Sequence, residues 1–319
     1  GSQRMKGAIL LAATGWDNDL WARLFGEASG RQVFIDPEGR DEDSIEYAIV
    51  WKQPPGSLAR LKNLKVIFSL GAGVDHIFRD PHVPDVPIVR VVSNDLTNRM
   101  SEFVVWQVLD HHRMGPKYRR QQRDRIWLED RSQPAAKDIA VGVMGLGVLG
   151  GDAARKLKAL GFNVTGWSRS PHALEGIETF HGADGLLQFL AGLDMLVCLL
   201  PLTPDTAGII NAQLIGQMTK RGPLGAPTLI NAGRGGLQNE ADILAALDGG
   251  LLSAVSLDVF QQEPLPSDSP FWTHPKVTIT PHAAAASDPY ALVQPIVDQM
   301  EAFDRGEALK NLVDRKHQY

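Results

Sequence analysis

Cysteine is almost absent from this chain, because Cys198 is the only one among its 319 residues. One cysteine excludes an intrachain disulfide and a metal site built from several cysteines. Cys198 lies in the apolar run 195–200, which is typical of a buried strand, so we expect a core residue rather than a nucleophile. The metal-ligand spacing H-E-x-x-H and the nucleophile motif G-x-S-x-G are also missing, and we predict no bound metal.

The chain also lacks an excess of positive charge and any long apolar run. Its formal net charge of −5 argues against nonspecific nucleic-acid binding, which needs a basic surface. No apolar run approaches the roughly 20 residues that span a bilayer, and no apolar signal segment precedes the first predicted strand. These absences favour a cytoplasmic protein of about two domains that binds neither nucleic acid nor membrane.

Glycine, in contrast, is placed with a regular spacing in residues 139–169. A β-branched apolar run at 139–144 predicts a buried strand, and Gly145, Gly147 and Gly150 follow it as G-x-G-x-x-G. A helix is predicted over 152–160 and a second strand over 162–167. The segment therefore has the pattern of one βαβ unit whose glycines lie at the strand-to-helix turn.

This pattern favours a dinucleotide-binding site over an ordinary tight turn. The first glycine allows the turn, the second lets the backbone approach a pyrophosphate, and the third lets helix and strand pack closely. The helix N-terminus then offers free N–H groups and the positive end of its dipole to the phosphates.

The end of the second strand indicates which dinucleotide is bound. NAD-binding units usually place Asp or Glu there, on the ribose hydroxyls, whereas this chain has Ser168-Arg169-Ser170. A guanidinium can form bidentate bonds to a ribose 2′-phosphate, so we favour NADPH over NADH. The alternative is that Arg169 is an ordinary solvated side chain.

Strands and helices alternate along the rest of the chain, which predicts the α/β class. Further strands are predicted at 7–13, 32–35, 48–51, 65–70, 87–92, 195–200, 228–231, 254–258 and 277–280, and further helices at 17–29, 58–61, 100–120, 206–219, 239–248 and 289–305. We expect two doubly wound, Rossmann-like parallel-sheet domains with a cleft between them. The last helix can return to the N-terminal part, giving a discontinuous domain of 1–101 with 288–319, and a second domain of 102–287.

Two loops of the N-terminal part are candidate ligand sites, because ligands of such sheets bind beyond the carboxyl ends of the strands. They are 51–56 and 70–74, and the backbone N–H groups of Ala72 and Gly73 could bind a carboxylate. A simple tight reversal of the chain is the alternative for 70–74.

Residues 113–137 are rich in Arg, Gln, Lys and Asp, with Trp127 isolated among them. An exposed tryptophan in a polar arm suggests a surface for a partner. A solvated loop with one buried tryptophan is the alternative.

Three polar residues follow three late strands. Arg234 follows 228–231, Glu263 follows 254–258, and His282 follows 277–280. If these strands are parallel to 139–144, all three side chains lie at the edge that carries the glycine turn. Their types suit ketone reduction: histidine can donate a proton near neutral pH, a carboxylate can orient it, and arginine can bind a carboxylate and polarise a carbonyl. Each residue alone is more often a surface or core residue, and it is their joint occurrence at three strand ends that favours the catalytic interpretation.

The ordered set of motifs resembles the D-isomer-specific 2-hydroxyacid dehydrogenases over essentially the whole chain. The matching segments are Gly71-Ala72-Gly73-Val74-Asp75, the glycine turn 145–150, Leu200-Pro201-Leu202-Thr203-Pro204-Asp205-Thr206, Asn231-Ala232-Gly233-Arg234-Gly235, Leu257-Asp258-Val259-Phe260 with Glu263-Pro264, and Pro281-His282. Trp51, 167–170, 269–272 and the tail 313–315 resemble the family's glyoxylate and hydroxypyruvate reductases most.

The resemblance implies a role for each of these residues. Arg234, His282 and Glu263 would be catalytic, with Arg234 on the 2-oxo acid and His282 as the acid/base paired with Glu263. Trp51, Ala72, Gly73, Arg234 and Trp272 would bind the substrate. NADP would contact Gly145, Leu146, Gly147, Val148, Leu149, Gly150, Ser168, Arg169, Ser170, Leu200, Pro201, Thr206, Ala232, Gly233, Asp258 and His282. The discontinuous domain would bind substrate, the other would bind NADP, and the 113–137 arm would join a homodimer contact.

One departure from the family pattern stands beside the predicted catalytic arginine. Many relatives have alanine where this chain has Gly233, and a glycine adds backbone freedom at that point.

The function implied is NADPH-dependent reduction of small 2-oxo acids, with glyoxylate and hydroxypyruvate as favoured substrates and His282 as proton donor. Two alternatives remain: a dehydrogenase for another 2-oxo acid, and a non-catalytic nucleotide-sensing corepressor on the same fold.

Overall fold

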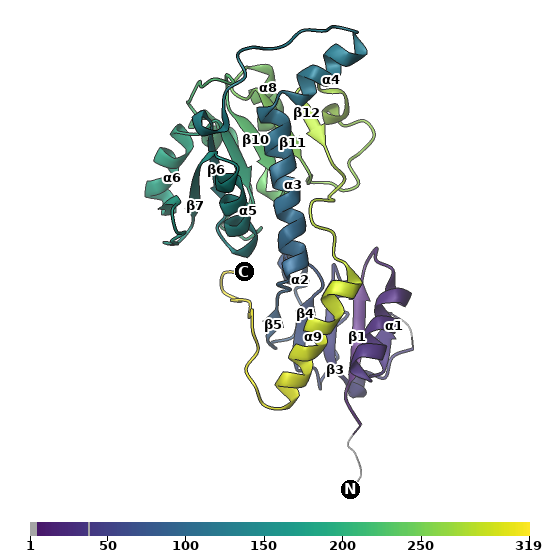
Figure 1. The fold of residues 1–319 in the computed structure, drawn as a ribbon. Helices are drawn as coiled ribbons and strands as arrows, with labels where there is room; N and C mark the ends of the chain where they lie inside the picture. The colour runs from purple at the N-terminus through teal and green to yellow at the C-terminus, as the bar shows by residue number, and fades with distance from the viewer. Residues whose placement is uncertain (1–4, 38) are drawn as a thin grey trace. The chain divides into compact units, whose positions relative to one another are not determined.

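A computed structural model of the chain describes residues 5–37 and 39–319, and Figure 1 shows their fold. The chain forms two compact units, one built from the part up to Leu96 together with Ser287–Tyr319, the other from Thr97–Ala286. The boundary predicted after residue 101 is five residues beyond the one in the structure, and the boundary predicted after residue 287 is one residue beyond it. In the described part of the chain, no helix has the length and apolar character needed to cross a membrane.

The first unit is organised around a five-stranded parallel sheet in the order β2-β1-β3-β4-β5. Its strands are β1 (Ala8–Ala13), β2 (Val33–Ile35), β3 (Ile45–Trp51), β4 (Val66–Ser69) and β5 (Ile88–Val89), and its helices are α1 (Asn18–Ser29), α2 (Asp75–Phe78) and α9 (Pro289–Asp304). Asp17 caps α1 by accepting from the Leu20 N–H at 3.2 Å, as its sequence position suggests. The order reverses between β1 and β3, so this sheet is doubly wound.

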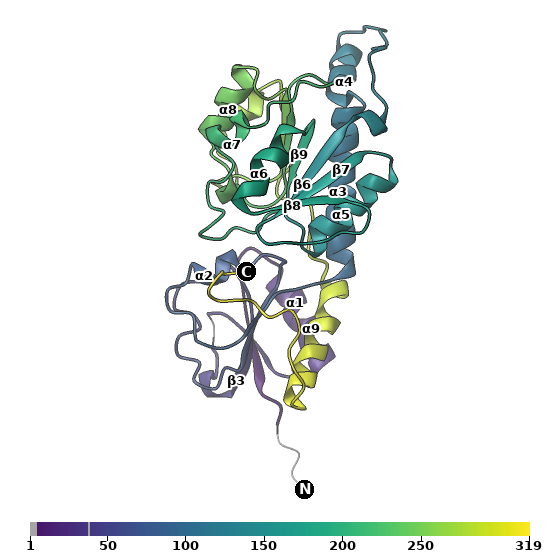
Figure 2. The same cartoon turned by 90° about the vertical axis from the view of Figure 1, so that its left-hand side faces the viewer.

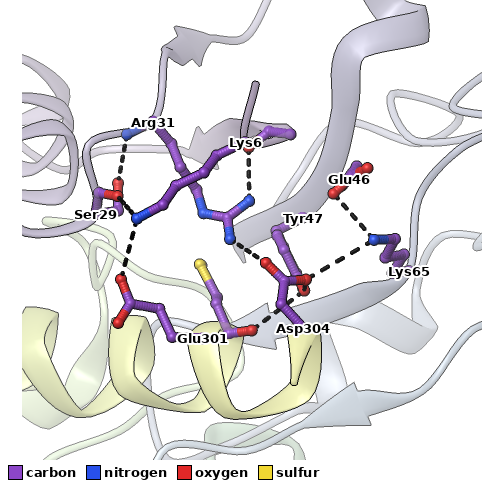
Figure 3. Close-up of polar contacts among 10 residues, drawn as sticks. Lys6, Ser29, Arg31, Glu46, Tyr47, Lys65, Glu301 and Asp304 are labelled. Carbon is purple, nitrogen blue, oxygen red and sulfur yellow. Dashed lines mark hydrogen bonds and ion pairs between the residues drawn. The ribbon is translucent and has the colours of Figure 1, made fainter. Parts of the chain in front are cut away.

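Polar contacts hold α9 to the N-terminal part of this unit (Figure 3). Asp304, at the end of α9, accepts hydrogen bonds from Arg31 and from the Tyr47 hydroxyl. Burial, and then the hydrogen bond to Asp304, raise the pKa of Tyr47 above its usual value. Lys65 lies 3.8 Å from the same carboxylate. These contacts join the last helix to the N-terminal strands and make the first unit discontinuous in sequence.

The second unit is organised around a seven-stranded parallel sheet in the order β12-β11-β10-β9-β6-β7-β8. Its strands are β6 (Ala140–Met144), β7 (Asn163–Ser168), β8 (Glu178–His181), β9 (Met195–Cys198), β10 (Thr228–Asn231), β11 (Ala254–Leu257) and β12 (Val277–Ile279). Its helices are α3 (Asn94–His112), whose first turn contains the unit boundary, α4 (Gly115–Arg123), α5 (Val148–Ala159), α6 (Gly182–Ala191), α7 (Ala212–Gly216) and α8 (Glu240–Asp248). The α/β class and the two parallel-sheet domains are confirmed.

Helices cover both faces of this second sheet (Figure 2). Alternate residues along β6 point to opposite faces. Val141 and Val143 pack with apolar residues of α3 and α5. Met144 packs with residues of α6, α7 and α8 on the other face. These two apolar layers form the core of the unit.

Three helix predictions are wrong. The helix predicted over 100–120 is two helices, because Met114 takes a left-handed φ of 59° and Pro116 follows in the first turn of α4. The first of them begins at Asn94 rather than Ser101. Residues 58–61 form only turns, and most of 206–219 is not helical.

The reason for the third error is a competing hydrogen bond. The Thr206 hydroxyl donates to the Pro201 carbonyl at 2.7 Å and accepts the Thr203 N–H, which forms a turn instead of a helix start. Helix α7 begins only at Ala212, where the Asn211 side chain caps it. Strand β8 and helix α6 were not predicted.

A buried network attaches α3 to β11. His111 and Ser256 lie 2.7 Å apart, and the Ser256 hydroxyl donates to the Gln107 side-chain oxygen at 2.6 Å. Burial lowers the pKa of His111 to about 4. The ring is therefore neutral in the folded protein at pH values where an unfolded histidine is protonated.

We predict that His111 makes the second unit sensitive to acid. Its folded pKa of about 4 lies below the unfolded value of about 6.5, so its contribution is complete above pH ~6.5 and is lost as the pH falls toward 4. Between pH 7 and pH 5 the free energy of unfolding should fall by about 2 kcal/mol more in the wild type than in His111→Gln. Urea unfolding at both pH values measures this difference. The control is His172→Gln at an exposed histidine, and equal pH dependence of wild type and His111→Gln would contradict the prediction.

Candidate functional site

The glycine turn lies where the strand order of the seven-stranded sheet reverses, between β6 and β9. Gly145 has a φ of +107°, and a Cβ there would lie 2.8 Å from the Leu199 backbone. A Cβ on Gly150 would lie 1.7 Å from the Gly145 carbonyl oxygen, so helix and turn are in close contact. Only glycine fits either position.

The first N–H groups of α5 are left for a ligand. Val148 begins the helix, and Gly147 before it provides no side-chain cap. Leu146 is 2% exposed and packs against Gly166 in the neighbouring strand, while Gly147, Val148 and Leu149 are at least partly exposed. The turn therefore fits a dinucleotide pyrophosphate at an uncapped helix N-terminus.

The end of β7 presents Ser168, Arg169 and Ser170 at the same edge of the sheet. The Ser168 hydroxyl donates to the Ser170 carbonyl at 2.7 Å. The Arg169 guanidinium lies 3.5 Å from Asp205, and both side chains are largely exposed. Asp205 belongs to the segment after β9, and the sequence did not indicate this pairing. An exposed pair of this kind is weak, so a phosphate could replace the carboxylate.

Arg234 is presented by a turn that a buried asparagine holds. Asn231 ends β10 with its side chain fully buried. Its amide donates to the Arg234 carbonyl at 3.2 Å, and its side-chain oxygen accepts the Gly233 N–H at 2.9 Å. Arg234 in turn donates to the Gly233 carbonyl at 2.9 Å.

Gly233 is closely surrounded rather than loose. A Cβ there would lie 2.7 Å from Leu237 and 2.8 Å from the Leu200 carbonyl oxygen. The glycine expected to add freedom beside Arg234 is thus buried and hydrogen-bonded, so packing limits that freedom. Ala232 and Leu200 are buried beside it, and Pro201 is partly exposed.

His282 and Glu263 form a hydrogen-bonded pair beyond β12 and β11. His282 Nδ1 lies 2.7 Å from Glu263 Oε2, and both side chains are partly exposed. The other carboxylate oxygen of Glu263 accepts the Phe260 N–H at 3.0 Å, which orients it. Because β10, β11 and β12 are parallel to β6, Arg234, Glu263 and His282 all follow strands at the edge that carries the glycine turn.

Asp258 holds the backbone that presents His282. Its side chain is 1% exposed, and it accepts from the Thr280 hydroxyl at 2.7 Å and from the Ala283 and Ala284 N–H groups at 2.8 and 3.2 Å. Its backbone carbonyl accepts the His282 N–H at 2.8 Å. His282 has a left-handed φ of 49°, which is uncommon outside glycine, and these bonds hold it there.

The predicted substrate residues are divided between the two units. Trp51 ends β3, and Ala72 and Gly73 follow β4, at the carboxyl edge of the five-stranded sheet, whereas Arg234 follows β10 in the second unit. Trp272 belongs to the second unit, is 51% exposed, and donates its indole N–H to the Pro266 carbonyl at 2.8 Å.

The single cysteine is buried in β9, where burial raises the pKa of its thiol to about 12. A thiol of this pKa is not a nucleophile near neutral pH, as its sequence context suggested.

Comparison with known proteins identifies the family. Residues 105–284 match the model of the D-isomer specific 2-hydroxyacid dehydrogenase NAD-binding domain. The chain belongs to the D-isomer specific 2-hydroxyacid dehydrogenase family. It is therefore an oxidoreductase with a nicotinamide-dinucleotide domain, as the resemblance of its motifs predicted.

Several members of this family are similar over nearly the whole chain. The glyoxylate/hydroxypyruvate reductase A of Yersinia enterocolitica is 40% identical over 281 residues, which cover 86% of this chain and 88% of that protein. The NADPH-dependent glyoxylate/hydroxypyruvate reductase of Sinorhizobium meliloti, solved with NADP and sulfate, is 48% identical with a TM-score of 0.93, covering 98% of this chain and 100% of the other. A probable 2-hydroxyacid dehydrogenase of Rhizobium etli, solved with NADP, HEPES and L(+)-tartaric acid, is 45% identical with a TM-score of 0.93, covering 99% of this chain and 100% of the other.

Sequence reasoning did not identify the residues that position the candidate catalytic groups. Asn231 and Asp258 had been noted only as parts of motifs or as a coenzyme contact. A polar residue at the end of a predicted buried strand was the available signal, because a buried amide or carboxylate must find partners among nearby backbone groups.

Proposed function

We propose that this dehydrogenase reduces glyoxylate to glycolate and hydroxypyruvate to D-glycerate with NADPH. The observation that carries the proposal is the hydrogen-bonded pair of His282 and Glu263, which follows parallel strands at the same sheet edge as Arg234 and the glycine turn. The names and ligands of the similar proteins support the substrates and the coenzyme.

Arg234 binds the substrate in this proposal. Its guanidinium donates to the carboxylate and to the carbonyl oxygen of the 2-oxo acid, which polarises the carbonyl. In this proposal the N–H groups of Ala72 and Gly73 bind a substrate carboxylate, and Trp51 and Trp272 also contact the substrate.

His282 supplies the proton. When bound, the coenzyme supplies the hydride that reduces the carbonyl carbon. The developing negative charge on the carbonyl oxygen then takes a proton from His282 Nε2, while Nδ1 keeps its hydrogen bond to Glu263. The hydrogen bond to Glu263 fixes the orientation of the imidazole ring throughout.

The coenzyme is held by residues of the second unit. The pyrophosphate binds at the glycine turn and α5, and Ser168, Arg169 and Ser170 bind the 2′-phosphate, for which Arg169 leaves Asp205. The other contacts of the nucleotide are Leu200, Pro201, Thr206, Ala232, Gly233 and Asp258.

The chain acts as a homodimer in this proposal, with the arm 113–137 in the contact. The tip of the arm is apolar and exposed: Trp127 is 102% exposed, Leu128 63% and Ile126 51%. Lys117 and Tyr118 of α4 bond to Asp130 and so hold the arm in place. Such a tip suits burial against a second copy.

Replacing the proposed acid/base tests the reaction. His282→Gln should lower kcat with glyoxylate by ~10²–10⁴-fold and leave the KM for NADPH nearly unchanged, since a proton donor contributes about that much. Glu263→Gln should cause a smaller loss. Steady-state oxidation of NADPH over a panel of 2-oxo acids measures both. The matched control is His274→Gln, which breaks another pair of histidine and carboxylate at 3.0 Å.

Near-full activity of His282→Gln would refute its role. If the wild type oxidises NADPH with none of the 2-oxo acids, the nucleotide-sensing alternative replaces this proposal.

Replacing Arg169 tests the proposed preference for NADPH over NADH. Arg169→Ala should raise the KM for NADPH by ~10- to ~100-fold, the value of one or two charge-assisted hydrogen bonds, and leave the KM for NADH nearly unchanged. Asp205→Asn is the control, because it removes the ion pair and keeps the guanidinium. Equal kcat/KM of the wild type for NADH and NADPH would disprove the preference.

Changing the tip of the arm tests the dimer. The wild type should have the mass of two 34.8 kDa chains by light scattering, and the triple variant Ile126→Ser, Trp127→Ser and Leu128→Ser should shift toward one chain. Leu187→Ser, which replaces an exposed leucine of α6, is the control. A monomeric wild type at micromolar concentration would exclude the homodimer.

A further inference from the structure

His76 connects the two loops at the carboxyl edge of the five-stranded sheet. It lies in α2, directly after the turn 70–74, and is 3% exposed. Its Nδ1 lies 3.0 Å from the Lys52 backbone nitrogen, in the loop after β3. Its Nε2 lies 3.1 Å from the Gly73 carbonyl oxygen and 3.0 Å from the Ser69 hydroxyl. One buried imidazole thus contacts both loops.

The hydrogen-bond partners assign the tautomer of this ring. A backbone N–H can only donate, so Nδ1 of His76 accepts from Lys52 and carries no hydrogen. Nε2 then carries the hydrogen and donates to Gly73 or Ser69. The Ser69 hydroxyl, which is fully buried, donates in turn to the Gly71 or Gly73 carbonyl, at 2.8 and 2.9 Å. The hydrogen bonds therefore all run in one direction: the Lys52 N–H donates to the imidazole, and the imidazole donates to the turn 70–74.

The loop 51–56 depends on the hydrogen bond to His76. Lys52 has a left-handed φ of 49°, which costs a non-glycine residue conformational energy. Both of its backbone polar groups are held, the N–H by His76 and the carbonyl by the Thr14 hydroxyl at 2.8 Å. The residue before it is Trp51, the last residue of β3, so the left-handed turn of the loop follows the indole directly.

The indole of Trp51 packs against both His76 and the turn 70–74. The Trp51 and His76 rings are 4.5 Å apart between centroids. A Cβ on Gly71 would lie 2.3 Å from the Trp51 ring, so the turn approaches the indole as closely as glycine allows. Trp16 packs on Trp51 at 5.7 Å. The position of the indole and the shape of the turn consequently depend on each other.

We propose that His76, in its neutral Nε2–H form, is a positioning residue of the substrate site. It fixes the indole of Trp51 and aims the N–H groups of Ala72 and Gly73 at one substrate carboxylate. This rests on the proposed function, in which those groups bind the 2-oxo acid. His76 acts only through the two loops, so its loss weakens substrate binding and leaves coenzyme binding intact.

Three substitutions at this position test the proposal. His76→Leu removes both hydrogen bonds and should lower kcat/KM for glyoxylate by ~10- to ~100-fold, mainly through KM, because the carboxylate contacts act on substrate and transition state alike. His76→Asn can still accept from Lys52, and His76→Gln can still donate to the turn. Each should recover part of the loss. The KM for NADPH should stay within about twofold in all three.

Ile45→Ala separates this role from plain destabilisation. Ile45 is fully buried in the same unit at the opposite end of β3, so the variant should lower the Tm without raising the KM for glyoxylate. A His76→Leu enzyme whose glyoxylate KM stays within about twofold of wild type would overturn the proposal. So would equal increases in the KM for glyoxylate and for NADPH.

Assaying the wild type with NADPH and glyoxylate distinguishes failure of the positioning role of His76 from failure of the proposed function. Turnover by the wild type with an unchanged KM in His76→Leu removes only the positioning role. Absence of turnover by the wild type refutes the proposed function and, with it, any substrate site for His76 to position.

Discussion

The parallel direction of the strands is the constraint on which the rest of the structure depends. Since every strand of the second sheet ends at the same edge, residues that are far apart in sequence are brought to one side: the glycine turn after β6, Arg169 after β7, Arg234 after β10, and His282 after β12. The first sheet obeys the same rule for Trp51 and the glycine turn after β4. The candidate chemistry of this dehydrogenase lies on turns, and the buried parallel sheets give those turns their places.

Buried polar side chains then hold three of these turn regions. Asn231 holds the Arg234 turn, Asp258 holds the backbone of His282, and His76 holds the loops around Trp51. A buried polar group without a partner is costly, so each of them satisfies backbone groups that the turn leaves open. The arrangement places the candidate catalytic groups on turns held by hydrogen bonds, and it includes left-handed backbone at Lys52 and His282.

The pattern of apolar runs and glycines was enough to predict both parallel sheets and the βαβ unit, because those features depend on local periodicity. The family was predicted from the resemblance of an ordered set of short motifs. Local reasoning was weaker where side chains compete with the backbone. It extended one helix through Met114 and placed another at 206–219, where the Thr206 hydroxyl forms a turn. It also treated Gly233 as a source of freedom, although Leu237 and Leu200 enclose it. These outcomes depend on side-chain hydrogen bonds, backbone conformation and packing, which the periodicity of apolar residues does not record.

The sequence by itself determined the class of fold, the dinucleotide turn and the residue types available for hydride and proton chemistry, since each follows from spacing along the chain. Only the tertiary structure decided how those residues are oriented. It paired His282 with Glu263 across two strand ends, placed Asp205 beside Arg169, and put a neutral His76 between two loops. The physical reason is that hydrogen bonds need atoms within about 3 Å, and the packing of the sheets and helices sets distances of that size.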